Sequence, residues 1–299
     1  MKKQLFVTTF CSLLLAGYGC SSQQANDAVQ DLTQYVDPYI GSGGHGHVFV
    51  GANVPYGLVQ LGPSSIPQEW DWTSGYHISD STVIGFPHMH LSGTGIGDLH
   101  DITLMPVVGE VTYARGVESD QTSGLWSYSD RSKEVVKPGY YATHLLRYNV
   151  DVELTATKRV GFHKYTFNQK ENAAVVFDLQ NGGCWDSPTK AYINKVDDKT
   201  IEGYRYSSGW ANDQRVFFVA EFSEPITSLP ARRSPLWPSI PRSVSSAVPA
   251  LLPASSVLFP KSNTAYGPQC LTLRPGLQYC YKKDGSPYRD YHLHYFDRV

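Results

Sequence analysis

The spacing of turn residues between positions 35 and 223 is the feature that most constrains the fold. Short runs rich in Val, Phe, Tyr and Thr alternate there with Gly, Asn, Asp and Pro, as in strands joined by turns. The runs are 57–61, 102–108, 140–148, 152–157, 161–167, 173–179 and 215–222. No segment has the periodicity of an amphipathic helix of about 12 residues. The sequence therefore predicts an all-β chain, an antiparallel β-sandwich, and about 190 residues are enough for one core.

Residues 70–101 differ from the rest of the chain in composition. Tryptophan, histidine, aspartate and glycine stand closer together here than elsewhere. Tryptophan faces stack on the apolar C–H face of a sugar ring, while Asp and His hydrogen-bond to hydroxyl groups. Gly93, Gly95 and Gly97 let the backbone turn sharply or approach a ligand, since no Cβ stands in the way. The composition favours a loop that binds a polyhydroxylated ligand, and an ordinary polar loop is the alternative.

Two other kinds of chemistry are open to the histidines and aspartates. The pairs His45/His47 and His88/His90 have the i, i+2 spacing that places two imidazoles on one face of a strand, where a transition metal could bind. A third ligand would have to come from His77 or a carboxylate, and we favour hydrogen-bonding roles. Acid–base work is conceivable for the aspartate pairs. Paired aspartates in glycine-rich loops more often bond to backbone N–H groups. These pairs are Asp71 with Asp80 and Asp98 with Asp101.

Long stretches of the chain resemble the N-terminal domain of glycoside hydrolase family 92, the calcium-dependent exo-α-mannosidases. The matching text is WDWTSGYHISDSTVIGFPHMHLSGTGIGDLHDITLMP, preceded by YVDPYIGSGGHGHVFVGANVPYGLVQLGP at 35–63. It continues through GYYATHLLRYNVDVELTATKRVGFHKYTF and GWANDQRVFFVAEFSEPIT, which ends at 227. The resemblance implies an N-terminal β-sandwich that packs against a larger α/α barrel. It also implies mannose-containing glycans as partners.

The resemblance assigns part of a sugar pocket to this chain. It implies that Trp70, followed by Asp71, touches the mannose, whereas a tryptophan in the sandwich core is the alternative. The residues that would support this loop or complete the pocket wall are Ser74, Tyr76, His77, Asp80, His90, Ser92, Thr94 and Asp98. For Tyr76 and Asp80 a structural role is favoured over direct contact. The sequence departs from the commonest family pattern at Trp72, Met89, Ile96 and His100, which leaves the linkage preference open.

The catalytic groups of the family are not assigned to any position here. Inverting hydrolysis needs a carboxylic acid and a carboxylate on opposite faces of the sugar. The resemblance places both, with most of the calcium ligands, in the α/α barrel. We therefore expect no catalytic residue, no metal ligand and no cofactor for this chain alone, although calcium serves the parent family.

Residues 228–299 have a different composition. The stretch 225–283 contains no Asp or Glu and is rich in Pro, Ser and Arg. Proline removes backbone donors and interrupts helices and strands, so we expect a mostly disordered tail. An out-of-frame continuation after about residue 227 explains the change, and a genuine proline-rich linker is the alternative. The domain prediction is thus a β-sandwich at 35–227 followed by this tail.

The first 20 residues read as an export signal. Two lysines precede an apolar run that ends in small residues before Cys20, and the run is too short to span a bilayer. The ending resembles a lipobox in which Tyr18 departs from the usual small residue, so we predict acylation of Cys20. Secretion without a lipid, or an ordinary buried helix, are the alternatives. Residues 21–34 would then be a polar tether at the bacterial envelope, in the outer membrane or periplasm.

Charge and cysteine content exclude other classes of protein. The 25 Lys and Arg nearly balance the 27 Asp and Glu, which does not suggest a nucleic-acid partner. Contact with a membrane is expected only through the lipid anchor. Cys184, Cys270 and Cys280 have neither metal spacing nor the even number of a disulfide framework.

Three functions are consistent with these observations. The first, which we favour, is a fragment of an exo-acting α-mannosidase that supplies the sugar-facing wall without activity of its own. The second is a carbohydrate-binding module for mannosides without turnover. The third is a small enzyme that uses the carboxylates of 70–101.

Overall fold

The computed structural model describes residues 31–110, 112–169, 172–180, 185–229, 254–258 and 269–277, and it confirms the all-β prediction. The chain forms two compact units that meet between Gln34 and Tyr35, and the fold below concerns the second unit. The helices among the described residues are single 3-10 turns. None of them is long and apolar enough to span a membrane.

Fifteen strands lie within the described ranges, several of them only two residues long. The first eight are β1 (Ala52–Asn53), β2 (Gln60–Leu61), β3 (Thr82–Val83), β4 (Thr103–Val108), β5 (Ser127–Tyr128), β6 (Val135–Lys137), β7 (Tyr140–Leu145) and β8 (Val150–Ala156). The others are β9 (Gly161–Phe167), β10 (Ala173–Asp178), β11 (Ser187–Lys195), β12 (Thr200–Ser208), β13 (Gln214–Phe222), β14 (Ala254–Leu258) and β15 (Gln269–Leu277). The 3-10 turns are η1 (Leu32–Tyr35), η2 (Gly44–Gly46), η3 (Trp70–Trp72) and η4 (Arg131–Lys133).

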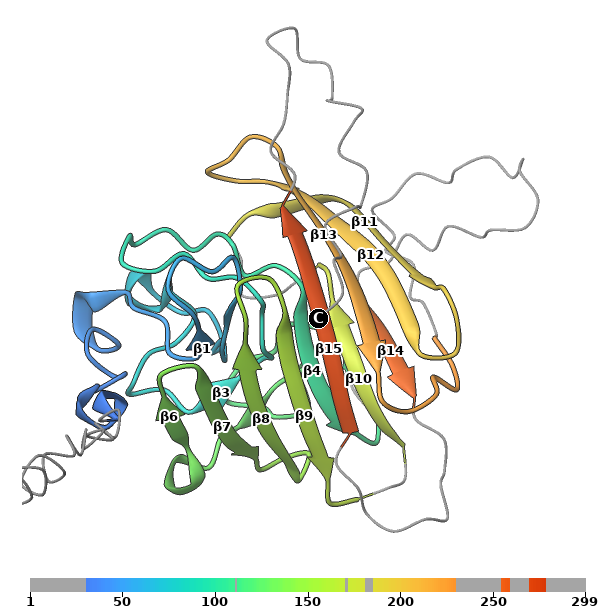
Figure 1. Ribbon diagram of the computed structural model, residues 1–299, viewed down its shortest axis with the longest axis horizontal. Coiled ribbons are helices and arrows are strands. Elements are labelled where there is room, and N and C mark those ends of the chain that lie inside the picture. Colours follow the sequence, from blue (N-terminus) through green and yellow to red (C-terminus); the bar gives the residue numbers. More distant parts are fainter. Residues whose placement is uncertain are drawn as a thin grey trace, which may run out of the picture. The chain divides into compact units, whose positions relative to one another are not determined.

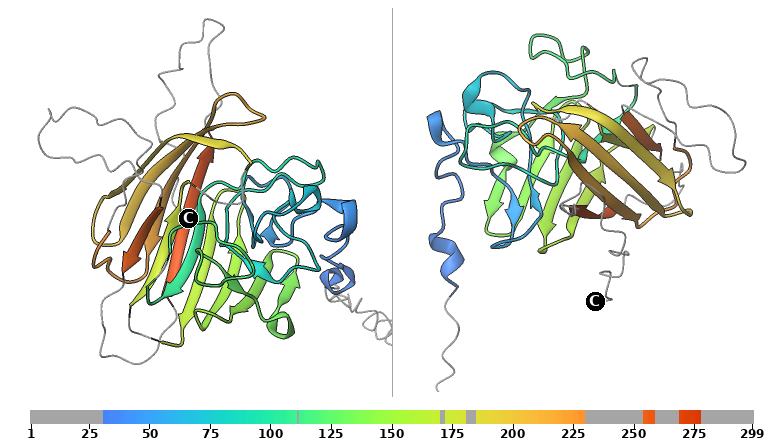
Figure 2. Two further views of the ribbon diagram at one scale, coloured as in Figure 1. Left: turned by 180° about the vertical axis from the view of Figure 1, so that it is seen from behind. Right: turned by 90° about the horizontal axis from the view of Figure 1, so that it is seen from above.

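Two antiparallel sheets enclose the core. The larger has the strand order β11-β12-β13-β15-β9-β8-β7-β6, and the smaller has the order β14-β10-β4. The smaller sheet lies against one face of the larger (Figures 1 and 2), where Phe177 of β10 stacks on Phe218 of β13 with 5.7 Å between ring centroids. Along β9 and β13 buried and partly exposed residues alternate, as expected of strands with one face on the core. Burying each large apolar side chain stabilises the fold by roughly 1.5–3 kcal/mol.

The residues between β1 and β4 gather beside the β6–β9 part of the larger sheet (Figure 1). Backbone hydrogen bonds hold this stretch together and join it to β4. Phe86 forms an antiparallel bridge with Leu104 of β4, and Ser64 pairs with Gly85 within the stretch. The amide of Gln60 donates to the carbonyl of His88 at 2.9 Å. These bonds fix the segment 70–101, although little of it is regular secondary structure.

The segment 228–299 departs at two places from the expectation of a tail without regular structure. Backbone pairing places β14 beside β10, and β15 lies between β13 and β9 inside the larger sheet. A strand in that position satisfies the N–H and C=O groups that β13 and β9 would otherwise leave unpaired. The run contains Pro275, whose missing N–H is unfavourable in a central strand, and for this reason composition predicts no strand there. The rest of the tail lies outside the described residues.

Candidate functional site

Trp70 lies at the surface and not in the sandwich core. Its side chain is 52% exposed, whereas the core contains Trp126, which is fully buried. The indole Nε1 donates to the carbonyl of Gly95 at 3.0 Å. Gly95 has a φ of +69°, and a Cβ built there would lie 2.7 Å from that same nitrogen. The ring is therefore held against glycine backbone, and about half of the residue stays exposed.

Two histidines and an aspartate surround one edge of Trp70. Asp71 Oδ1 lies 2.6 Å from His45 Nδ1 and 3.4 Å from His47 Nε2. The His47 ring meets the Trp70 ring edge-on, with centroids 4.1 Å apart. The hydrogen bond from His45 is the main reason why the pKa of Asp71 lies below its usual value. The ionised carboxylate thus orients both imidazoles beside the exposed ring.

These histidines do not resemble a metal centre. Within the parts of the chain that the structure describes, no three His, Cys, Asp or Glu side chains come together as metal ligands. Calcium prefers six to eight oxygen ligands, but Asp71 is joined by imidazole nitrogens. The residues around Asp71 therefore do not fit the calcium that the family resemblance implies.

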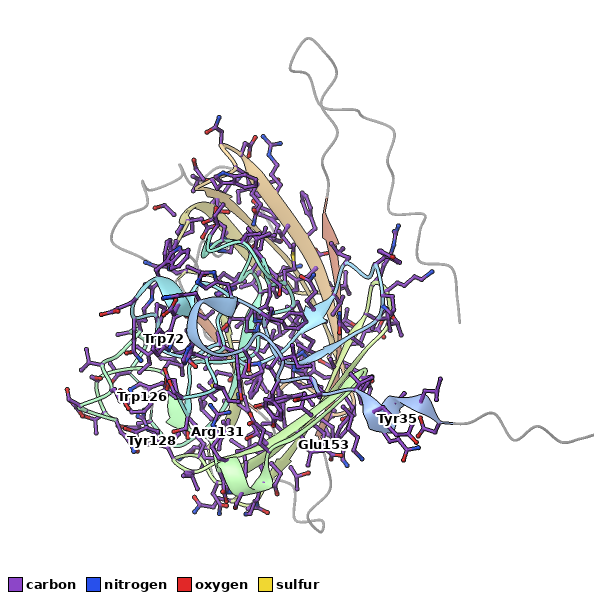
Figure 3. All side chains as sticks on the ribbon, turned by 90° about the vertical axis from the view of Figure 1, so that its left-hand side faces the viewer. Tyr35, Trp72, Trp126, Tyr128, Arg131 and Glu153 are labelled. Atoms are coloured by element: carbon purple, nitrogen blue, oxygen red, sulfur yellow. The ribbon has the colours of Figure 1, made fainter. Side chains whose placement is uncertain are left out.

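Trp72, His77 and Asp80 brace the loop that carries Trp70. The Trp72 indole donates to Asp80 Oδ2 at 2.7 Å, and its ring stacks on His77 with centroids 4.4 Å apart. Asp80 Oδ1 accepts from the amide of Thr82 at 2.7 Å. Trp72 lies on the same side of the molecule as Arg131 (Figure 3), which contacts the carbonyl of Asp80. His77 is partly exposed, and Asp80 is buried in a supporting position.

Ser74 and Tyr76 lie beneath the surface. Ser74 Oγ donates to the carbonyl of Tyr76 at 3.2 Å. The Tyr76 hydroxyl donates to Glu134 Oε2 at 3.1 Å, and Glu134 also accepts from Tyr141 at 2.8 Å. Burial raises the pKa of the Tyr76 phenol well above its ordinary value. Tyr76 therefore ties the 70–80 loop to Glu134, directly before β6, while the Ser74 bond stays within the loop.

His90 is buried as well, and its ring is held by backbone. Its Nδ1 lies 2.7 Å from the carbonyl of Gln60, and its ring stacks on Phe49 at 5.0 Å. Burial lowers the pKa of His90 to about 3, so the ring is neutral. The neighbouring pair His88 and His163 is likewise buried, with the two Nε2 atoms 2.6 Å apart. His88 and His90 thus hydrogen-bond to different partners, and they do not share a metal ligand set in the described residues.

Ser92, Thr94 and Asp98 occupy the glycine-rich loop. Ser92 Oγ accepts from the amide of Phe49 at 3.3 Å. Thr94 is exposed, and its Oγ1 accepts from the amide of Ile96 at 3.3 Å. Asp98 is buried, and its Oδ2 accepts from the backbone N–H of Trp210 at 2.7 Å. Of the predicted site residues, Trp70 and Thr94 are exposed, and Asp71, His77 and Ser92 are partly exposed. The buried ones are Ser74, Tyr76, Asp80, His90 and Asp98.

Two tryptophans that the sequence interpretation did not include reach the same loop. Trp185 donates its backbone N–H to the carbonyl of Gly97 at 2.8 Å. Trp210 lies in the turn between β12 and β13, and its backbone N–H bonds Asp98 of the loop. Both side chains are exposed. In the sequence GGC precedes Trp185 and SSG precedes Trp210. A tryptophan directly after such glycine-containing text was the available sign that each stands in a turn.

A buried arginine joins the loop to the strands beneath it. Arg205 of β12 bonds Asp101 Oδ1 at 2.5 Å and Asp186 through two bonds of 2.7 and 2.8 Å. Gln214 donates to the other oxygen of Asp101. Burial raises the pKa of Asp101, while Arg205 acts in the opposite direction. The network holds Asp101, three residues after Asp98, and Asp186, the residue after Trp185.

The hydrogen bonds also bear on the suggested acid–base pairs. Asp80 and Asp98 accept from backbone amides, Asp101 accepts from Arg205 and Gln214, and Asp71 pairs with His45. A carboxyl group that serves as an anchor in this way is not poised to transfer a proton to a glycosidic oxygen. Each of these four carboxylates is therefore engaged by a protein group.

Comparison with known proteins identifies the family. Residues 35–235 match the model of the glycosyl hydrolase family 92 N-terminal domain. A family GH92 α-mannosidase of Bacteroides thetaiotaomicron, solved with mannoimidazole, superimposes with a TM-score of 0.74 at 31% identity. That match covers 82% of this chain and 32% of the mannosidase. An inverting mannosidase of the same organism shares the fold, with a TM-score of 0.60 at 19% identity over 85% of this chain and 32% of that one.

A curated relative is an uncharacterized secreted glycosidase of Arthroderma benhamiae. It is 28% identical over 144 residues, which are 46% of this chain and 17% of the relative. The chain thus spans about a third of the length of the solved mannosidases, and less of the fungal protein. From the family match over more than half of its residues, the chain belongs to glycoside hydrolase family 92 and carries that family's N-terminal β-sandwich domain.

Proposed function

We propose that this domain forms the sugar-facing wall of an α-mannosidase active site and binds mannose-containing glycans. The observation that supports this most is the half-exposed Trp70, whose indole is held in place by a hydrogen bond to Gly95. A tryptophan face of this kind stacks on the apolar C–H face of a pyranose. The solved relative with 31% identity is an α-mannosidase whose structure contains mannoimidazole, which is consistent with a mannoside ligand.

Polar groups beside the ring would orient the sugar. His45 is exposed, and its Nδ1 is engaged by Asp71, so its other ring nitrogen is directed away from the carboxylate. A bond between carboxylate and imidazole fixes the tautomer and the ring orientation. The exposed hydroxyl of Thr94 adds a donor on the adjoining loop. The ring gives affinity and the polar groups give orientation, which is the usual division in a small-ligand site.

The proposed contribution to catalysis is binding and orientation. Inverting glycoside hydrolysis needs two carboxyl groups separated by roughly 6.5–9.5 Å. We assign those groups, and calcium, to the α/α barrel that the family resemblance implies. Holding the pyranose against a rigid wall would position its glycosidic bond for such groups, and correct positioning is itself a large part of rate enhancement.

Isothermal titration of the 299-residue chain with methyl α-mannoside tests the proposal. Trp70→Ala is expected to weaken binding at least tenfold, because the stacking face is removed. Tyr56→Ala serves as the control, since Tyr56 is fully exposed and lies outside the site. Equal affinities of the unaltered chain and Trp70→Ala would overturn the assignment.

We also propose export. The secreted relative supports it, and the signal and the acylated Cys20 lie outside the described residues. Mass spectrometry of the N-terminal peptide from cells tests the anchor. A diacylglyceryl mass on Cys20 that is absent from Cys20→Ala is expected, whereas an unmodified N-terminus beyond Cys20 would indicate simple secretion.

A further inference from the structure

Trp185 and Trp210 come from outside the segment 70–101 and are strongly exposed. Their side chains are 50% and 75% exposed, which is unusual for the largest apolar side chain. Trp185 stands just before β11, and Trp210 stands in the turn between β12 and β13. Both bond the glycine-rich loop 92–98, to which the Trp70 indole is also hydrogen-bonded.

The Trp185 ring rests on Gly97. A Cβ built on Gly97 would lie 2.5 Å from Cγ and Cδ1 of the indole, so that only glycine leaves room for the ring. The backbone N–H of Trp185 donates to the Gly97 carbonyl at 2.8 Å. This is the arrangement of Trp70 on Gly95 repeated two residues further along the same loop.

Trp210 is fixed through its backbone. Its N–H donates to Oδ2 of the buried Asp98, and a Cβ on Gly209 would lie 2.6 Å from that oxygen. The turn is therefore packed against the carboxylate, and the indole that it carries projects into solvent.

The two tryptophans are preorganised from beneath. Arg205 is 2% exposed and binds Asp186, the neighbour of Trp185, together with Asp101, which closes the loop after Asp98. A ring that is already fixed loses little conformational entropy when a ligand stacks on it. Exposed rings held in this way are more suited to binding than to a purely structural role.

The anchors of the three rings are close together. Gly95 and Gly97 are separated by one residue, so their Cα atoms lie at most about 7 Å apart, and Asp98 follows directly. We propose that Trp185 and Trp210 form a second saccharide subsite beside Trp70, so that the wall receives two adjoining sugar residues of an oligosaccharide. The inference rests on the proposed function and extends it from a monosaccharide to a chain.

The polar surroundings favour a saccharide as the occupant. The loop 92–98 reads SGTGIGD and the turn 207–213 reads SSGWAND, in which hydroxyl, amide and carboxylate groups surround the rings. Within these two stretches, Trp210 is the one large hydrophobic residue of the described chain that is exposed. Isolated aromatic faces among hydrogen-bonding groups match the alternation of C–H faces and hydroxyls on a sugar.

The test compares ligands of different length on the 299-residue chain. Titration calorimetry is performed with methyl α-mannoside and with an α-linked mannotriose, on the unaltered chain, Trp185→Ala, Trp210→Ala and Gly97→Ala. Each substitution is expected to lower the affinity for mannotriose roughly threefold to tenfold, the size of one aromatic stacking contact. Affinity for methyl α-mannoside is expected to change less than twofold. Tyr56→Ala is the matched exposed-aromatic control.

The outcomes separate this inference from the proposed function. Equal affinity of the unaltered chain for the two ligands, or unchanged mannotriose affinity in Trp185→Ala and Trp210→Ala, overturns the second subsite while the Trp70 site stands. Loss of both ligands in Trp185→Ala places that ring in the first subsite and also overturns the inference. Mannotriose binding that depends on Trp185 but not on Trp70 supports the inference and contradicts the proposed role of Trp70. No binding of either ligand by the unaltered chain overturns both proposals.

Discussion

Arg205 and Asp186 are joined by two parallel hydrogen bonds of 2.7 and 2.8 Å, and both side chains are excluded from solvent. The bidentate geometry is the strongest form of ion pair between these residue types. Because Asp186 directly follows Trp185, the buried Arg205–Asp186 pair fixes the backbone position of the exposed Trp185.

Removal of Arg205 is expected to be strongly destabilising. Arg205→Met leaves Asp101 and Asp186 buried without their partner, which costs about 3–5 kcal/mol of unfolding free energy. Arg215→Met is the control on the neighbouring strand, since its pair with Asp213 is partly open to solvent and contributes about 0–1 kcal/mol. Urea unfolding of the two variants measures the difference. Similar losses in both would contradict the structural role assigned to Arg205.

Gly95 is expected to control the orientation of Trp70. In Gly95→Ala the new Cβ meets the indole nitrogen at 2.7 Å, so the ring must move and mannoside affinity is expected to fall about tenfold. Gly93→Ala is the matched control, because Gly93 has a similar φ of +75° and its Cβ would meet nothing within 4 Å. Backbone strain is thus common to both variants, and the clash is confined to one. Equal affinities in the two variants, measured by calorimetry, would argue against ring positioning by Gly95.

Acid is expected to destabilise the fold through buried histidines. Burial lowers the pKa of His90 and His163 to about 3, below the ordinary 6.5. The unfolded chain therefore binds more protons between pH 6.5 and 3, so this contribution to stability is complete above pH 6.5 and declines as pH falls. The slope is about 1.4 kcal/mol per pH unit for each histidine.

His90→Asn is expected to reduce the slope of the unfolding free energy against pH by about 1.4 kcal/mol per pH unit, the contribution of one histidine. His45→Asn is the control, because the side chain of His45 is 80% exposed. Urea unfolding between pH 7.5 and 5 measures both slopes. An unchanged slope in His90→Asn would show that His90 is not the titrating group.

The strands of the sandwich were largely predictable from the sequence. The runs 161–167 and 173–179 correspond to β9 and β10, because alternating or wholly apolar patterns persist along them. Strands β11 and β12 were not predicted. β11 contains Pro188, beside a shift in register, and β12 contains Gly203, and both residue types are unfavourable in strands. Pairing in the sheet overrides the weak local preference there.

The site was predictable only where its residues are close in sequence. Trp70 and Asp71 stand in one motif, and local composition indicates a binding loop. Trp210 contacts Asp98 across 112 residues of sequence, and no local pattern reports such a contact. The buried positions of Tyr76 and His90 likewise depend on Glu134 and Gln60, which other elements supply.

The 299-residue chain is expected to bind mannosides without hydrolysing them. Asp71, Asp80, Asp98 and Asp101 already accept hydrogen bonds from protein groups, which leaves no acid–base pair among these four. Mannose release from an α-mannoside is measured with purified protein. Turnover by this chain that disappears in Asp98→Asn would contradict the assignment of Asp98 as an anchor.

The Trp70 indole offers the most direct test of the central claim, that this ring is a sugar-binding face. Nitrogen–proton correlation spectra resolve indole N–H groups, and Trp70→Phe identifies the signal of Trp70, whose N–H is bonded to Gly95. Titration with methyl α-mannoside is predicted to shift the Trp70 signal saturably and to leave that of the buried Trp126 in place. A Trp70 signal that does not move while the sugar binds would contradict the account.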